Sequence, residues 1–249
     1  MNNWHEVVLT VEPAIVKIET PSGNGTGFLC LYNHDKSWCG IATALHVVGS
    51  ADQWQQPIRI TQVTTMKTTF MTHSDRAIYL DWNTDSAIIL IPTPPDFNFP
   101  ANPIPMRSLD KPLNIGDEIG WMGFPYLEPW QLCFFSGCVS ARKEDRKAYL
   151  IDGVSINGVS GGPVVYAGAG EGGKGIEIIG LISAYMANKA TGETLPGLLI
   201  AQDVTHLHDV AIKVKSIDQA RRETQKKKDE EASQDKPPLS SAGPTVASA

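Results

Sequence analysis

Short stretches of apolar residues, or of alternating apolar and polar residues, recur along most of this chain. Clusters of Gly, Pro, Asn and Asp separate them, as at residues 21–25 and 33–36. Such spacing is typical of an all-β barrel or sandwich. The pattern predicts a first series of strands at residues 14–19, 26–32, 38–42, 58–63, 77–80 and 86–91.

A proline-rich segment over residues 92–105 interrupts this series. Proline has no N–H to donate to a neighbouring strand, so prolines at this density predict an extended linker. A second series of strands follows at residues 118–122, 132–140, 148–151, 162–166, 176–183 and 198–201. The sequence therefore predicts one β-domain over residues 1–91 and another over residues 106–203.

The pattern changes again after residue 203. Apolar residues at Val204, Leu207, Ile212 and Ile217 lie among charged residues that favour helices, which predicts a C-terminal helix over residues 204–231. Residues 232–249 are rich in Pro, Ser and Ala and predict a disordered tail.

Composition limits the classes of function. The net charge of −6 argues against nucleic acid as the main partner. No apolar run is long enough for a membrane-spanning helix, and the first residues lack the basic and apolar regions of a secretory signal, so we expect a cytoplasmic protein without a membrane partner. In that compartment the four cysteines, Cys30, Cys39, Cys133 and Cys138, are expected as reduced thiols and not as disulfides or zinc ligands.

The most informative segment is the run Gly158-Val159-Ser160-Gly161-Gly162. A serine among glycines is typical of an exposed nucleophile on a tight turn, because glycine adopts backbone angles that other residues avoid. The N–H groups of Gly158 and Ser160 are candidate donors to one oxygen, as in an oxyanion hole.

Two further residues complete a candidate catalytic triad. His46 follows an apolar run, and Asp85 directly precedes an apolar strand. Serine needs an imidazole to accept its proton, and the imidazole needs a carboxylate to orient it. Asp81 is the alternative carboxylate. The chain order His46, Asp85, Ser160 is that of only one familiar triad arrangement.

These motifs resemble those of trypsin-like (chymotrypsin-fold) serine proteases, and most closely those of the HtrA/Do branch. The resemblance rests on residues 25–28 (GTGF), 43–47 (TALHV), 85–87 (DSA), 120–125 (GWMGFP), 136–140 (SGCVS), 158–163 (GVSGGP) and 180–183 (GLIS). It implies an all-β fold of two six-stranded antiparallel barrels with the site in the cleft between them. No PDZ-like module follows in the sequence.

The resemblance also implies the activity and the substrate contacts. We expect a cofactor-free serine endopeptidase that acts on proteins or peptides through an acyl-enzyme. Ser183 would bond to the triad aspartate, and the backbone at Ala184 and Tyr185 would pair with the substrate. Val154 would lie at the base of the primary pocket, which Tyr185 would narrow, so that small or medium apolar side chains are preferred.

Two other functions remain open at this point. The chain could be an inactive protease fold that only binds, or an acyl hydrolase (esterase) that uses the same triad. No metal site is expected, because His206 and His208 are two residues apart and do not share a helix face. The sequence does not indicate the oligomeric state.

Overall fold

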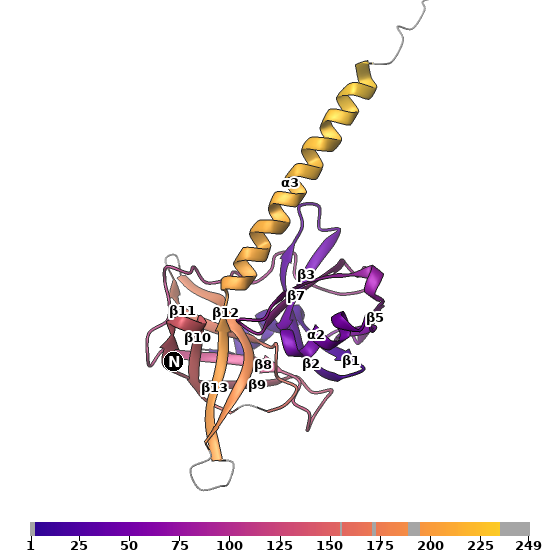
Figure 1. The fold of residues 1–249 in the computed structure, drawn as a ribbon. Coiled ribbons are helices and arrows are strands. Elements are labelled where there is room, and N and C mark those ends of the chain that lie inside the picture. The colour runs from indigo at the N-terminus through magenta and orange to yellow at the C-terminus, as the bar shows by residue number, and fades with distance from the viewer. Residues whose placement is uncertain (1–2, 155, 171–172, 189–194, 235–249) are drawn as a thin grey trace, which may run out of the picture.

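The computed structural model describes residues 3–154, 156–170, 173–188 and 195–234. Two antiparallel β-structures lie side by side, and a long helix projects away from them (Figure 1). The first half contains α1 (Trp4–Val11), β1 (Ile15–Thr20), β2 (Gly23–Tyr32), β3 (Trp38–Ala44), α2 (Leu45–Gln53), β4 (Ile58–Gln62), β5 (Lys67–Met71), β6 (Ala77–Asp81) and β7 (Ser86–Pro92). The second contains β8 (Glu118–Gly123), β9 (Cys133–Lys143), β10 (Ala148–Asp152), β11 (Pro163–Gly170), β12 (Gly173–Asn188), β13 (Leu195–Asp203) and α3 (Thr205–Gln234).

The first β-structure is a seven-stranded sheet in the order β5-β4-β1-β2-β3-β7-β6. Its inner face is filled by branched aliphatic side chains, among them the fully buried Ile18, Ile41, Ile60 and Ile88. These residues suit a pleated, buried surface, and their burial provides the main driving force for folding. The sheet's edge strands β5 and β6 do not pair with each other, so the first half is an open seven-stranded sheet and not the expected six-stranded barrel; β5 is the strand that the pattern did not predict.

The second β-structure is a closed barrel in the order β10-β13-β12-β11-β8-β9. Its interior is filled by large side chains, including the fully buried Trp121, Ile119, Ile151 and Leu199. All six strands that the pattern predicts in this half are present. The expected all-β class with a C-terminal helix is thereby confirmed.

One strand and two α-helices of the first half were not predicted. Strand β5 lies at the sheet edge and buries only Met71, so its sequence has no apolar alternation. Helix α1 is anchored by Val7 and Val11, one helical turn apart. Helix α2 follows β3 without a break in the apolar run, so the change from strand to helix has no clear sequence signal.

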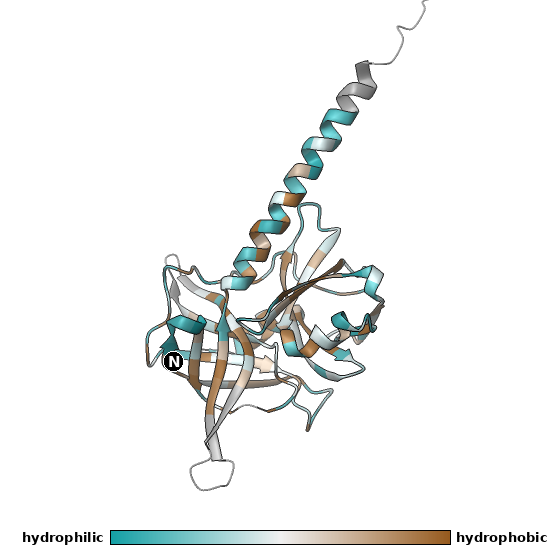
Figure 2. Cartoon of the chain, viewed as in Figure 1, coloured by the Kyte–Doolittle hydropathy of each residue, from teal (hydrophilic) through white to brown (hydrophobic). Residues whose placement is uncertain are grey.

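Helix α3 begins at the body of the protein and extends well beyond it (Figure 1). Leu207 and Val210 are fully buried in the same core as the first sheet. Ile212 and Ile217, two of the apolar residues that predicted the helix, are 63% and 52% exposed, whereas Leu207 and Val210 face the body. The outer part of the helix is hydrophilic (Figure 2). The helix ends at Gln234, so residues 232–234 are helical and not part of a tail; residues 235–249 lie outside the described residues.

The cysteines are all free thiols, as expected, with Cys30 and Cys39 buried and Cys138 exposed. Burial raises the pKa of Cys30 far above its ordinary value and that of Cys39 to about 11, so both are inert protonated groups at neutral pH. Within the described ranges, no helix combines the length and apolar character needed to cross a membrane.

Candidate active site

His46 lies in the first turn of α2, at the end of the sheet strand β3. The first N–H groups of a helix have no partner within it. Ala44, which precedes the helix, has only a methyl side chain, which cannot accept a hydrogen bond from these N–H groups. The cap comes from Asp85: its carbonyl accepts the Leu45 N–H at 2.9 Å, and its Oδ1 accepts the His46 N–H at 3.0 Å. The helix that carries His46 is therefore fixed to the residue that faces the imidazole.

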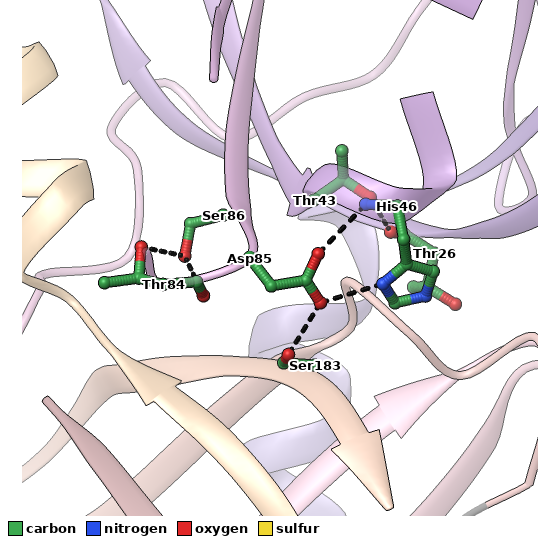
Figure 3. A network of polar contacts seen from close by, with 7 residues as sticks. All are labelled: Thr26, Thr43, His46, Thr84, Asp85, Ser86 and Ser183. Carbon is green, nitrogen blue, oxygen red and sulfur yellow. Dashed lines mark hydrogen bonds and ion pairs between the residues drawn. The ribbon is translucent and has the colours of Figure 1, made fainter. Parts of the chain in front are cut away.

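Asp85 uses its other carboxylate oxygen for the imidazole itself. Oδ2 lies 2.8 Å from His46 Nδ1 and accepts a second hydrogen bond from Ser183 Oγ at 2.6 Å (Figure 3). An ionised carboxylate only accepts, so Nδ1 must carry a proton. The neutral imidazole then has a lone pair at Nε2, which is the state required of a general base.

The turn before Asp85 is held by Asp81, the alternative carboxylate. One Asp81 oxygen accepts the Asn83 N–H and the other accepts the Thr84 hydroxyl, both at 2.9 Å. Asp85 itself has φ of 49°, a left-handed conformation that aspartate tolerates better than most residues. Asp81 thus shapes the turn, while Asp85 is the carboxylate that contacts His46.

Ser160 lies on a turn whose peptide groups are held on both sides. The Tyr126 N–H donates to the Asn157 carbonyl at 2.6 Å, and the Gly162 N–H donates to the Val159 carbonyl at 2.9 Å. In a planar trans peptide the N–H points opposite to the carbonyl. The N–H groups of Gly158 and Ser160 therefore point away from these two internal bonds, and neither donates a hydrogen bond within the described part of the chain.

Glycine is required at two positions of this turn. Gly158 and Gly161 have φ of +96° and +83°, which a side chain would strain. A Cβ on Gly161 would also lie 2.2 Å from the Thr26 carbonyl oxygen and from the Thr43 hydroxyl oxygen. Gly161 thus allows the turn to pack directly against the first sheet, while Gly158 allows it to pack against the backbone of Phe124 in the second half.

Ser160 is partly exposed, and its Oγ makes no hydrogen bond among those of the described residues. His46 is also accessible, with 48% of its side chain exposed. A bond between nucleophile and base is often long or absent until substrate is bound. No hydrogen bond between Ser160 Oγ and His46 is present among those of the described residues, so the pairing of these two residues stays a prediction.

The expected substrate contacts lie on β12 and in the loop before Ser160. The pairing of β12 with β11 ends at Leu181, whereas its pairing with β13 continues through Ala184 and Tyr185. One edge of β12 is thus unpaired from Ser183 onward among the described residues. Ala184 is exposed there, and the Tyr185 side chain lies outside what the structure describes.

Val154, which was expected at the base of the primary pocket, has a side chain that is 60% exposed. The neighbouring Gly153 packs closely on the buried Trp121 ring: a Cβ added to it would lie 2.2 Å from that ring. The role of Val154 in substrate binding stays a prediction.

The two histidines of α3 do not form a metal site. His206 Nε2 lies 3.4 Å from the Tyr79 carbonyl oxygen, and His208 Nε2 lies 3.0 Å from that of Arg107, so the rings contact different segments. Across the described ranges, no group of three or more His, Cys, Asp or Glu side chains is placed to hold a metal ion.

Sequence reasoning assigned no role to Thr26 or Trp82, which the structure places beside the site. Thr26 contacts the Ser160 turn through its backbone and its side chain. Trp82, three residues before Asp85, is largely exposed and lies next to Gly49, one turn after His46 on α2. Thr26 was part of a family motif, but its contacts could not be read from its sequence neighbours.

Comparison with known proteins agrees with this geometry. Residues 25–171 match the sequence profile described as a trypsin-like peptidase domain. No curated protein sequence matches the chain. Solved structures with a similar fold include a serine endoprotease from Yersinia pestis, with a TM-score of 0.60 and 22% identity over 86% of this chain and 67% of that one.

Two other solved structures give similar values. Deg5 has a TM-score of 0.59 and 20% identity over 84% of this chain and 94% of its own. The Rv3671c protease of M. tuberculosis, in an inactive form, has a TM-score of 0.57 and 18% identity over 84% and 92%. At these identities the likeness concerns the fold.

Proposed function

Because the chain belongs to the trypsin-like peptidase family, we propose that it is an active serine endopeptidase whose triad is His46, Asp85 and Ser160. The observation that carries the proposal is the double contact of Asp85 with His46, supported by Ser183. This arrangement gives the imidazole one tautomer and one orientation, which a purely structural histidine does not need.

In the proposed reaction, Ser160 Oγ attacks the carbonyl carbon of the peptide bond while its proton passes to His46 Nε2. The negative charge develops on the carbonyl oxygen, which the N–H groups of Gly158 and Ser160 stabilise. The C–N bond breaks as Nε2 returns the proton to the leaving amine, which leaves an acyl group on Ser160. Water then loses a proton to His46 Nε2 as its oxygen attacks the ester carbonyl carbon. The bond between that carbon and Ser160 Oγ breaks as Nε2 returns the proton to Oγ, which releases the acid and restores the serine.

Asp85 stays ionised throughout this cycle. Its charge favours the imidazolium that forms when His46 accepts the proton. The bond from Ser183 and the cap on α2 keep the carboxylate in place while the charge on the ring changes. The two N–H donors, whose peptide carbonyls are already bonded, need no rearrangement when the oxyanion forms.

The proposed substrate is an extended polypeptide. The unpaired edge of β12 from Ser183 through Tyr185 offers backbone groups with which a substrate strand could pair, a mode that makes few demands on sequence. Val154 would place an apolar, uncharged side chain beside the residue on the acyl side of the cut. A buried Arg or Lys would find no partner on Val154, so small or medium apolar residues are the proposed preference.

The proposal is tested with a fluorophosphonate probe, which forms a covalent bond with an activated serine. We expect the wild type to be labelled on Ser160, and Ser160→Ala to lose both labelling and peptide cleavage. Ser74→Ala, at an exposed serine in the short helical turn between β5 and β6, is the matched control and should be labelled like the wild type. A folded wild type that is not labelled would favour an inactive binding module. Labelling with turnover of esters but not of peptides would favour an esterase.

A further inference from the structure

Thr26 belongs to β2 of the first sheet, but its N–H and its hydroxyl form hydrogen bonds with the second half of the chain. Its N–H donates to the Ser160 carbonyl at 2.8 Å, and its carbonyl accepts the Thr43 hydroxyl at 2.7 Å. The residue is fully buried. A buried threonine that bonds across the boundary between two sheets joins them at one point, and here that point is the serine turn.

The direction of the Thr26 hydroxyl is determined by its neighbours. The Phe124 N–H lies 3.0 Å from Oγ1 and can only donate, so Oγ1 is the acceptor in that bond. The single hydroxyl proton is therefore available for the Gly158 carbonyl oxygen, 2.9 Å away. The Thr26 side chain is also closely packed, which restricts other rotamers of its hydroxyl: a Cβ added to Gly123 would lie 2.8 Å from Oγ1.

The Gly158 carbonyl belongs to the peptide that lies between the two candidate oxyanion donors. The Gly158 N–H belongs to the peptide before it and the Ser160 N–H to the peptide after it. The orientation of the middle peptide therefore sets the angle between the donors. On its other side, among the described residues, this peptide is held by the Val159 N–H, which donates to the Ile156 carbonyl at 3.2 Å. Gly158, with φ of +96°, lacks the side chain that would otherwise restrict its rotation.

From this geometry we propose that Thr26 is a positioning residue for the oxyanion hole. Its hydroxyl holds the Gly158–Val159 peptide so that the N–H groups of Gly158 and Ser160 stay directed at one oxygen. The inference deepens the proposed function and rests on it. Thr26 does not touch the reacting atoms; it acts through the Gly158 carbonyl from the opposite sheet.

The test compares variants that separate the hydroxyl from the methyl group. Thr26→Val keeps the shape and removes the hydroxyl, while Thr26→Ser keeps the hydroxyl and removes the methyl. Thr61→Val is the matched control, because Thr61 is also buried and its hydroxyl bonds at 2.9 Å to Thr68 on the edge strand β5. Each variant is first checked by thermal unfolding, and the rates are measured below its transition. If the valine variant does not fold, Thr26→Cys, with a weak donor of similar size, replaces it.

Losing one oxyanion donor outright costs about 10²–10³ in turnover. A donor that is misdirected but present should cost less, so we expect Thr26→Val to lower kcat and probe labelling roughly 10- to 100-fold with little change in KM. Thr26→Ser should recover most of the rate, and Thr61→Val should match the wild type. Binding of a peptide boronate, which forms a tetrahedral adduct with the serine, should weaken in parallel with kcat.

Three results would overturn the inference. The first is a Thr26→Val variant (or Thr26→Cys, where it replaces it) that keeps the wild-type kcat. The second is a variant whose lower kcat/KM comes from a raised KM alone. The third is a Thr26→Ser variant as impaired as Thr26→Val, which would assign the effect to packing of the methyl group. A wild type that is itself neither labelled nor active would instead overturn the proposed function, so the two failures are distinguishable.

Discussion

Both oxygens of the Asp85 carboxylate contact His46, one at its backbone N–H (3.0 Å) and the other at its Nδ1 (2.8 Å). Since an amide can donate where a carboxylate only accepts, Asp85→Asn should favour the wrong imidazole tautomer. We expect kcat to fall by about 10⁴, the general magnitude for triads of this type. Peptide turnover and the circular dichroism spectrum of each variant check this expectation.

Comparing Asp81→Asn with Asp85→Asn tests which of the two aspartates orients His46. Asp81 bonds to Asn83 and Thr84 and has no hydrogen bond to His46 among those of the described residues. Its substitution should therefore cost far less activity than that of Asp85. A larger loss at residue 81 than at residue 85 would reverse the assignment.

The glycines of the serine turn give a prediction about stability. Gly161→Ala should lower the free energy of unfolding by more than about 3 kcal/mol, because the backbone strain adds to a clash with the Thr26 carbonyl. Gly116 has a similar φ of +93° but no atom within 4 Å of an added Cβ. Gly116→Ala should therefore cost only the strain, about 1–2 kcal/mol. Urea unfolding of both variants measures the difference, and equal losses would contradict the close contact at Gly161.

Glu19 gives a prediction about acid stability. Burial alone would raise the pKa of this carboxyl, but the hydrogen bond from Arg59 (2.7 Å) and the Lys17 ammonium (3.3 Å) outweigh it and hold the pKa below 4.5. A lowered carboxyl pKa stabilises the fold above the unfolded-state value, and this contribution is lost as pH falls through the folded-state value.

Glu19→Gln should therefore destabilise the protein at pH 7, where it also leaves the buried Lys17 without its carboxylate. The difference from the wild type should shrink as the pH falls below 4.5. Thermal unfolding between pH 3 and 7 checks this, with Glu6→Gln on the exposed face of α1 as control. A difference that stays constant over that range would show that the charge of Glu19 is not the cause.

The rates at which the four cysteine thiols react with an alkylating reagent test which of them are buried. Iodoacetamide at pH 8 should modify the exposed Cys138 first. Cys133 should follow more slowly, because burial and the nearby Glu128 raise its pKa. Cys30 and Cys39 should react only after unfolding, since burial keeps them protonated. Peptide mass spectrometry after timed quenching gives the order, and early modification of Cys39 would contradict the packing of β3.

The features that sequence predicted correctly are those encoded locally. The six strands of the second barrel follow from short apolar runs between turn residues. The tight turn at Ser160 follows from its glycines, and the proximity of His46 to Asp85 follows from the family motifs. The strands and the turn follow from neighbouring residues, whereas the contact between His46 and Asp85 was expected only from the family resemblance.

The features that sequence missed depend on contacts between distant segments. Helix α2 receives its N-terminal cap from Asp85, which lies in another segment of the chain, so no capping residue marks its start. On helix α3, Val210 is buried against the first sheet while Ile212 is exposed, because packing against that sheet determines which face of the helix is covered. The Thr26 hydroxyl meets Gly158 across 132 positions of sequence, a pairing that only the folded chain creates.

The bonds from Thr26 to the serine turn also have a consequence for the order of folding. Two carbonyls of that turn, those of Gly158 and Ser160, find their donors on the first sheet, and His46 and Asp85 lie there as well. A second barrel that has folded alone therefore holds the serine without its base and with the turn only partly restrained. Under the proposed function, peptide cleavage therefore requires that the two halves have docked, and a partly folded chain carries a serine that His46 does not activate.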